Sequence, residues 1–176
     1  MKLLQYFLKD DGRFPNSHLP VLLYKRAVKL PFFFRYGYVK KILRKHHWTN
    51  NWRNGIYTYH HYHSNTHEVM AVIKGWTRLR LGGENGMTIK IEKGDVILIP
   101  AGVAHKNMRN EKDVICVGGY PHGKDYDINY GKEEERPAAD RLISKVQIPG
   151  FDPLTGKNGP MNAIWEKYAK KIPAKE

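Results

Sequence analysis

The alternation of apolar and polar residues in the middle of the chain predicts short β-strands. In residues 87–92, methionine and isoleucine alternate with threonine, lysine and glutamate, so the apolar side chains share one face. Three glycines in residues 82–86 predict the tight turn of a hairpin. By the same signals we expect strands over 56–63, 68–74, 76–81, 87–92, 95–99 and 113–118. Many short strands at even spacing predict a sandwich or a barrel.

The segment that precedes these strands predicts two more strands and a helix. Residues 1–8 and 20–28 are apolar, which favours strands, and residues 32–47 predict a helix that begins after Pro31. The expected apolar face of this helix consists of Phe32, Tyr36, Val39 and Leu43, which stand at helical spacing.

The segment that follows the strands is rich in proline and glycine. Five prolines fall between residues 121 and 160, which predicts an extended segment, with one or two helical turns over 138–145 and a last helix over 161–170. We therefore expect one domain over residues 1–176. Its parts are strands and a helix in 1–54, the barrel strands in 55–120, and a wrapping segment in 121–176.

Composition narrows the class of protein. Aromatic residues make up 12% of the 176 residues, which is typical of a packed globular protein. The single cysteine, Cys116, lies in an apolar run and excludes an intramolecular disulfide, so we expect an inert buried thiol and a cytoplasmic location. No apolar stretch approaches the roughly 20 residues that span a bilayer, and we expect no membrane partner.

Positive charge is concentrated in the first third of the chain. The net charge is +13, and residues 1–54 carry twelve Lys or Arg against two Asp. Such a surface attracts anions, but a solvated face is the simpler interpretation, because charge alone carries no specificity. We do not expect nucleic-acid binding, since only one N-terminal helix is predicted where a helix-turn-helix module would need more.

The candidate chemistry lies in a cluster of histidines between residues 60 and 68. Side chains at positions i and i+2 of a strand share a face, so His61 and His63 are expected to point together and His60 away from them. Further along, an apolar strand ends at Pro100, and His105 follows a tight turn. If the fold brings His105 beside the first pair, imidazole and carboxylate ligands would suit a first-row transition metal.

The spacing of these residues resembles the two motifs of the cupin superfamily. Residues 55–75 have the form G-x5-H-x-H-x4-E-x6-G, and residues 94–105 have the form G-x5-P-x-G-x2-H. Arg109 stands where the family usually has asparagine, and Asn107 is out of register. The motif therefore does not predict the geometry of the turn after His105. The flanking segments resemble a bacterial cupin subgroup without an assigned reaction.

The resemblance implies an all-β jelly-roll β-barrel with flanking N-terminal and C-terminal helices. It implies one divalent metal ion (Zn, Fe, Mn, Ni or Cu) held by His61, His63, Glu68 and His105. We favour Glu68 over its neighbour His67 on motif register, with His67 as a residue that orients a ligand or replaces one.

For function, the resemblance implies a metal-binding cupin that acts on a small molecule, as an oxygenase or an isomerase. The alternative is a non-catalytic cupin that binds a small molecule, as a metabolite sensor or a storage protein; the sequence leaves open whether the chain is an enzyme. We also expect a homodimer, because the apolar strands at 1–8 and 20–28 offer an edge that a second copy would cover.

Overall fold

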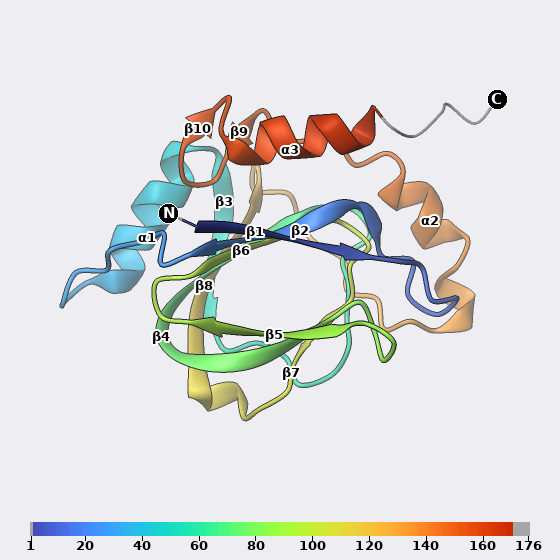
Figure 1. Cartoon of the computed structure of the whole chain (residues 1–176), viewed down its shortest axis with the longest axis horizontal. Helices are drawn as coiled ribbons and strands as arrows, with labels where there is room; N and C mark the ends of the chain where they lie inside the picture. Colours follow the sequence, from blue (N-terminus) through green and yellow to red (C-terminus); the bar gives the residue numbers. More distant parts are fainter. Residues whose placement is uncertain (1, 171–176) are drawn as a thin grey trace.

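Antiparallel β-strands dominate the computed structural model, which describes residues 2–170 (Figure 1). The strands are β1 (Lys2–Leu8), β2 (Ser17–Lys25), β3 (Trp48–Asn54), β4 (Glu68–Leu81), β5 (Met87–Glu92), β6 (Val96–Ile99), β7 (His105–Asn107) and β8 (Val114–Pro121). They are arranged in the order β1-β2-β6-β4-β8-β3, and β5 and β7 pair with the far half of β4.

Strand β4 belongs to both walls of the barrel, which are the two layers of strands that face each other across its interior. Its first residues pair with β6 and β8, and its last residues pair with β5 and β7. Between the two halves, Gly75 has a φ of 71°, and a Cβ atom there would lie 1.9 Å from the carbonyl oxygen of Asp113. Glycine is therefore required at this bend, which turns the strand from one wall into the other.

Apolar side chains fill two layers, one between the walls and one on the outer face of the larger wall. Along β2, Val21 and Leu23 point inward while Leu22 points outward, and both faces are buried. The outer layer is covered by α1 (Arg35–Lys45) and α3 (Pro160–Ala169), with Trp165 fully buried against it. Burial on both faces explains the continuous apolar runs of β2 and β6.

Short elements complete the chain. They are α2 (Ala138–Ile143), the 3-10 turns η1 (Glu111–Asp113) and η2 (Glu133–Glu135), and the two-residue strands β9 (Phe151–Asp152) and β10 (Gly156–Lys157). Apart from η1, these short elements lie within residues 122–170, around the barrel strands (Figure 1), and residues 171–176, the end of the expected wrapping segment, lie outside the described part of the chain.

Three sequence predictions about elements are wrong. Residues 56–63 form a loop with isolated bridges at His61 and Tyr62, and the strand lies earlier, at 48–54. That strand is polar, and its pairing shifts register beside Asn50, which has a φ of 52°, so no alternation marks it. Residues 68–74 and 76–81 are one strand. The first helix begins at Arg35 rather than 32, because Phe34 adopts a left-handed conformation.

Candidate metal centre

An isolated β-bridge and one further backbone hydrogen bond join the two histidine-bearing segments. His61 exchanges backbone hydrogen bonds with His105, the first residue of β7, at N–O distances of 3.2 and 2.9 Å. The Gly102 N–H donates to the carbonyl oxygen of His63 at 2.8 Å, which ties the Pro-x-Gly turn to the same loop. Local pairing therefore aligns the histidines without a continuous strand, and the i, i+2 relation of His61 and His63 survives in the loop.

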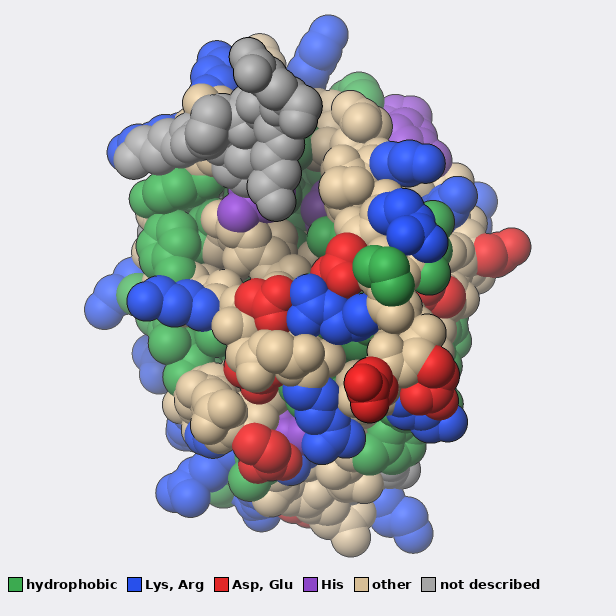
Figure 2. Space-filling model, turned by 90° about the vertical axis from the view of Figure 1, so that its right-hand side faces the viewer, with side chains coloured by type: hydrophobic (Ala, Val, Ile, Leu, Met, Phe, Trp, Pro, Cys, Tyr) green, Lys and Arg blue, Asp and Glu red, His purple; other side chains and the backbone are tan. Residues whose placement is uncertain are grey.

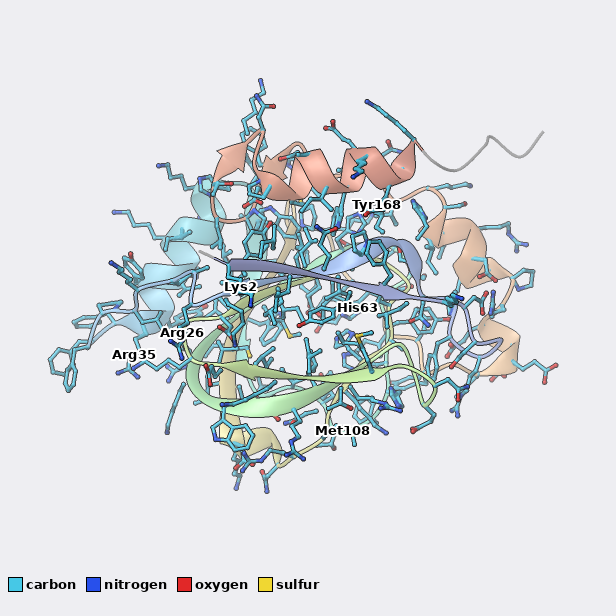
Figure 3. The ribbon with its side chains drawn as sticks, in the orientation of Figure 1. Lys2, Arg26, Arg35, His63, Met108 and Tyr168 are labelled. Atoms are coloured by element: carbon cyan, nitrogen blue, oxygen red, sulfur yellow. The ribbon has the colours of Figure 1, made fainter. Side chains whose placement is uncertain are left out.

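The structure brings all four expected ligands together inside the barrel. One ring nitrogen from each of His61, His63 and His105 lies within 4.8 Å of the others. Glu68, the first residue of β4, places Oε2 3.5 Å from His63 Nε2 and 3.3 Å from His105 Nε2. All four side chains are buried, and His63 lies between the upper and lower walls in Figure 3.

Backbone carbonyl oxygens orient the three imidazole rings. The Nδ1 atom of His61 faces the carbonyl oxygen of Tyr59 at 3.3 Å, and that of His105 faces the carbonyl oxygen of Val103 at 3.1 Å. The Nδ1 atom of His63 is hydrogen-bonded to the carbonyl oxygen of Asp127. A protonated Nδ1 that donates to a carbonyl leaves the Nε2 lone pair free to bind a metal.

Glu68 has one satisfied and one unsatisfied carboxylate oxygen. Its Oε1 accepts a hydrogen bond of 2.8 Å from the Tyr120 hydroxyl, which in turn accepts one of 3.0 Å from Trp52 Nε1. Its Oε2 is buried and has no hydrogen-bond partner among the described residues. A buried carboxylate oxygen without a donor is costly, and a cation between it and the imidazoles would satisfy it. The donor set therefore fits a divalent transition metal.

A metal needs an ionised carboxylate and neutral imidazoles, and the electrostatics of the group favour these states at Glu68 and His61. Burial raises the pKa of Glu68, but the imidazoles of His63 and His105 lower it well below its ordinary value, so the carboxylate is ionised. Burial and the neighbouring His105 lower the pKa of His61 to about 3, which keeps that ring neutral. Burial lowers the pKa of His63, yet Glu68 raises it above its ordinary value overall.

A cavity of about 120 Å³ opens beside the group. It is lined by Trp52, Asn54, Gly55, Ile56, Tyr57, His61, His63, Glu68, Tyr120 and Tyr126. The rings of Tyr120 and Tyr126 stack at 4.7 Å, and Tyr126 meets His63 edge-on at 4.9 Å. Four of these ten lining residues are Trp or Tyr, and none of the described lining residues is a lysine or arginine, which is typical of a site for a small molecule.

His67 lies outside the group of histidines. Because it neighbours Glu68 at the start of β4, it points to the opposite face. Its Nδ1 accepts a hydrogen bond of 3.0 Å from the Ala101 N–H, its ring lies 4.7 Å from that of Trp165, and burial lowers its pKa to about 4. His60 also points away, with Nε2 3.0 Å from Glu84 Oε1.

The turn after His105 is held by the out-of-register asparagine. Asn107 is buried; its Oδ1 accepts from the Thr77 hydroxyl and from the Arg109 N–H, and its Nδ2 donates to the carbonyl oxygen of Asn110 at 3.1 Å. The guanidinium of Arg109 instead lies over the Trp76 ring at 3.8 Å. The departure from the motif thus leaves His105 in place.

Sequence reasoning missed two residues that support the group. Asp127 accepts hydrogen bonds from the backbone and side chain of Ser64 and so fixes the histidine loop, and Tyr120 holds Glu68. Both lie far from the motifs along the chain. The one signal in the sequence for such a supporting residue is a side chain with a hydroxyl near the end of an apolar strand, as at Tyr120 in β8.

Comparison with known proteins identifies the class. The family model described as "Cupin domain" matches residues 53–117. A curated relative aligns over almost the whole chain, and with this fold and histidine group we conclude that the chain belongs to the cupin family. That relative is the uncharacterized protein YjlB of Bacillus subtilis (strain 168), 40% identical over 163 residues, which are 92% of this chain and 96% of YjlB.

Several solved structures are similar in fold. Acireductone dioxygenase from Bacillus anthracis, with cadmium in its active centre, has a TM-score of 0.44 at 14% identity, over 62% of this chain and 83% of its own. The sugar 3,4-ketoisomerase QdtA of Thermoanaerobacterium thermosaccharolyticum has a TM-score of 0.39 at 12% identity, over 53% of this chain and 74% of its own. Pumpkin pro-11S globulin has a TM-score of 0.38 at 17% identity, over 46% of this chain and 22% of the globulin.

Within residues 2–170, no helix has the length and apolar character needed to cross a membrane.

Proposed function

We propose that the protein binds one divalent first-row transition metal ion through His61, His63, Glu68 and His105, and acts on a small molecule held in the adjoining cavity. The unpartnered Oε2 of buried Glu68, facing imidazoles at 3.3 and 3.5 Å, is the observation that carries this proposal. Three imidazoles and one carboxylate leave positions open for water or substrate, as a catalytic site requires.

When bound, the metal would supply Lewis-acid chemistry on a carbonyl or a site for dioxygen, which are isomerase-type and oxygenase-type reactions. The chain itself would supply position and environment. Tyr120 fixes the direction of the Glu68 carboxylate, and the carbonyl oxygens at Nδ1 fix the rings. The stacked Tyr120 and Tyr126 would hold a flat substrate and keep water from one side of it.

The lining of the cavity limits the substrates we propose. No lysine or arginine is among the lining residues, so an anionic group could find its positive charge only at the metal. We therefore propose a neutral molecule, or one whose anionic oxygens bind the metal directly. The names of the structural neighbours include a dioxygenase, an isomerase and a globulin, so the fold by itself does not select one function.

We further propose a cytoplasmic homodimer. Strand β1 is the outer strand of the sheet, paired only with β2 among the described residues, and Phe7 on it is half exposed. A second copy paired at this edge would cover it. Light scattering at micromolar concentration should give twice the 20.5 kDa mass of the chain, and a monomer mass alone would contradict this part of the proposal.

Metal analysis tests the proposed function directly. Protein purified without chelators should contain about one transition metal per chain, and His61→Ala and His105→Ala should lose it. The matched control is His18→Ala, an exposed histidine outside the group, which should keep it. Full metal content in both site variants would refute the assignment.

A second measurement separates enzyme from binding protein. The metal-loaded protein is screened for dioxygen uptake and for isomerisation of small carbonyl compounds, and denatured protein is analysed for co-purified molecules. Turnover that depends on His105 supports the proposal. A retained molecule that is never transformed, and that stays bound after metal removal, would favour the storage or sensor alternative.

A further inference from the structure

Three consecutive phenylalanines form an exposed tip before the first helix. Phe32, Phe33 and Phe34 are 79%, 70% and 90% exposed, although the sequence pattern predicts Phe32 on the buried face of a helix. Phe34 has a φ of 57°, so the chain turns there and the helix starts only at Arg35. In Figures 1 and 3 this loop protrudes from the left-hand end of the molecule, beside the labelled Arg35.

Exposure of three large aromatic side chains in one place is unusual for a surface that meets only water. Isolated exposed apolar residues are ordinary, but a contiguous patch marks an interaction surface. The three rings line a groove together with Ile73 and Ile115, so the apolar surface extends from the tip toward the sheet. We call Phe32, Phe33 and Phe34 the aromatic tip.

Positive charge predominates around the aromatic tip. Residues 13–67 contain ten Lys or Arg and neither Asp nor Glu. Eight cations in and around this end have no ion pair within the described part of the chain: Lys29, Arg35, Lys40, Lys41, Arg44, Lys45, Arg53 and Lys74. The opposite end differs, because acidic and basic side chains are interspersed there (Figure 2).

We propose that the aromatic tip and these cations dock the protein peripherally on an anionic lipid surface. Protruding aromatic rings can enter the boundary between headgroups and acyl chains, while nearby lysines and arginines bind the anionic headgroups. The protein would lie on the membrane and not span it. This differs from the expectation, drawn from hydropathy alone, that the chain has no membrane partner.

The charge distribution selects a lipid surface over a second copy of the chain. A two-fold contact at this end would bring two sets of these eight cations together, and their mutual repulsion disfavours it. An anionic bilayer offers both an apolar interior for the rings and counter-charges around them. The groove behind the tip shares no lining residue with the metal cavity, so docking and metal binding can be tested separately.

Vesicle co-sedimentation tests the proposal with full-length, metal-loaded protein. The wild type should bind vesicles of phosphatidylcholine with about 30% phosphatidylserine, and should bind pure phosphatidylcholine far more weakly. Binding should weaken as salt rises from about 0.1 to 1 M, because the screening length falls from roughly 10 to 3 Å. The variant with Phe32→Ser, Phe33→Ser and Phe34→Ser should bind anionic vesicles at least about ten-fold more weakly.

Matched controls make the outcome decisive. Leu142→Ser changes an exposed apolar residue on α2, at the other end of the molecule, and should leave binding unchanged. All variants should keep wild-type metal content, which shows that they fold. Absence of wild-type binding, or equal binding by the triple-serine variant, would overturn the proposal. So would a dimer that dissociates in that variant, or tip-dependent binding to single-stranded DNA in preference to vesicles.

Discussion

Replacement of Tyr120 by phenylalanine removes one hydroxyl and tests whether the hydrogen bond from that hydroxyl orients Glu68 for metal binding. That hydroxyl donates to Glu68 Oε1 at 2.8 Å, and all of the contact is buried. A hydrogen bond to a charged group contributes about 1.5–3 kcal/mol. If this free energy holds the carboxylate in its metal-binding direction, its loss lowers metal affinity by about 10- to 100-fold. The ring remains and keeps its stacking on Tyr126.

A competition titration between the protein and a fluorescent chelator measures this change in the metal dissociation constant. Tyr126→Phe is the matched control, because Tyr126 lines the same cavity but makes no hydrogen bond to Glu68. In a Glu68→Gln background the Tyr120→Phe effect should largely vanish, since both changes act through one carboxylate. Equal affinity in Tyr120→Phe and wild type, or an undiminished effect in the Glu68→Gln background, would refute this reasoning.

Three further results are expected. Glu68→Gln should weaken metal binding by about 10- to 100-fold and His67→Gln should do less, as metal titration of chelator-stripped variants would show; the reverse order would make the site a four-histidine shell. Because Glu68 raises the pKa of His63, a proton held below that pKa competes with the metal. Affinity should therefore rise with pH until the pH passes that raised pKa and should level off above it. Proton release should be detectable by calorimetry in two buffers, and a flat profile would contradict the prediction. Gly75→Ala should lower the free energy of unfolding by about 2–4 kcal/mol in a denaturant titration, while Gly150→Ala, which has open space around it, should change it little.

The sequence by itself determined the class of fold and the identity of the candidate ligands. Alternation with period two marks strands wherever one face is buried, as in β5. Motif spacing selected His61, His63, Glu68 and His105, because the family pattern carries the geometry of pairing that local periodicity cannot supply. Strand parity also separated His60 from the pair correctly, since the two faces of an extended segment are a local property.

Only the tertiary structure decided what depends on contacts between distant segments. Strand β3 is mostly polar, and only its pairing with β8 and the packing of Trp48 against the core, both contacts with distant segments, make it a strand. The bond from Tyr120 to Glu68 and the support from Asp127 join residues far apart in the chain, where no spacing rule applies.

The exposure of the aromatic tip shows the same limit. Phe32 has the helical spacing of a core residue, but the left-handed turn at Phe34 delays the helix and leaves all three rings outside. Periodicity predicts which face a side chain takes within an element. Where the element begins, and what covers that face, depend on backbone geometry and packing that the rest of the chain imposes.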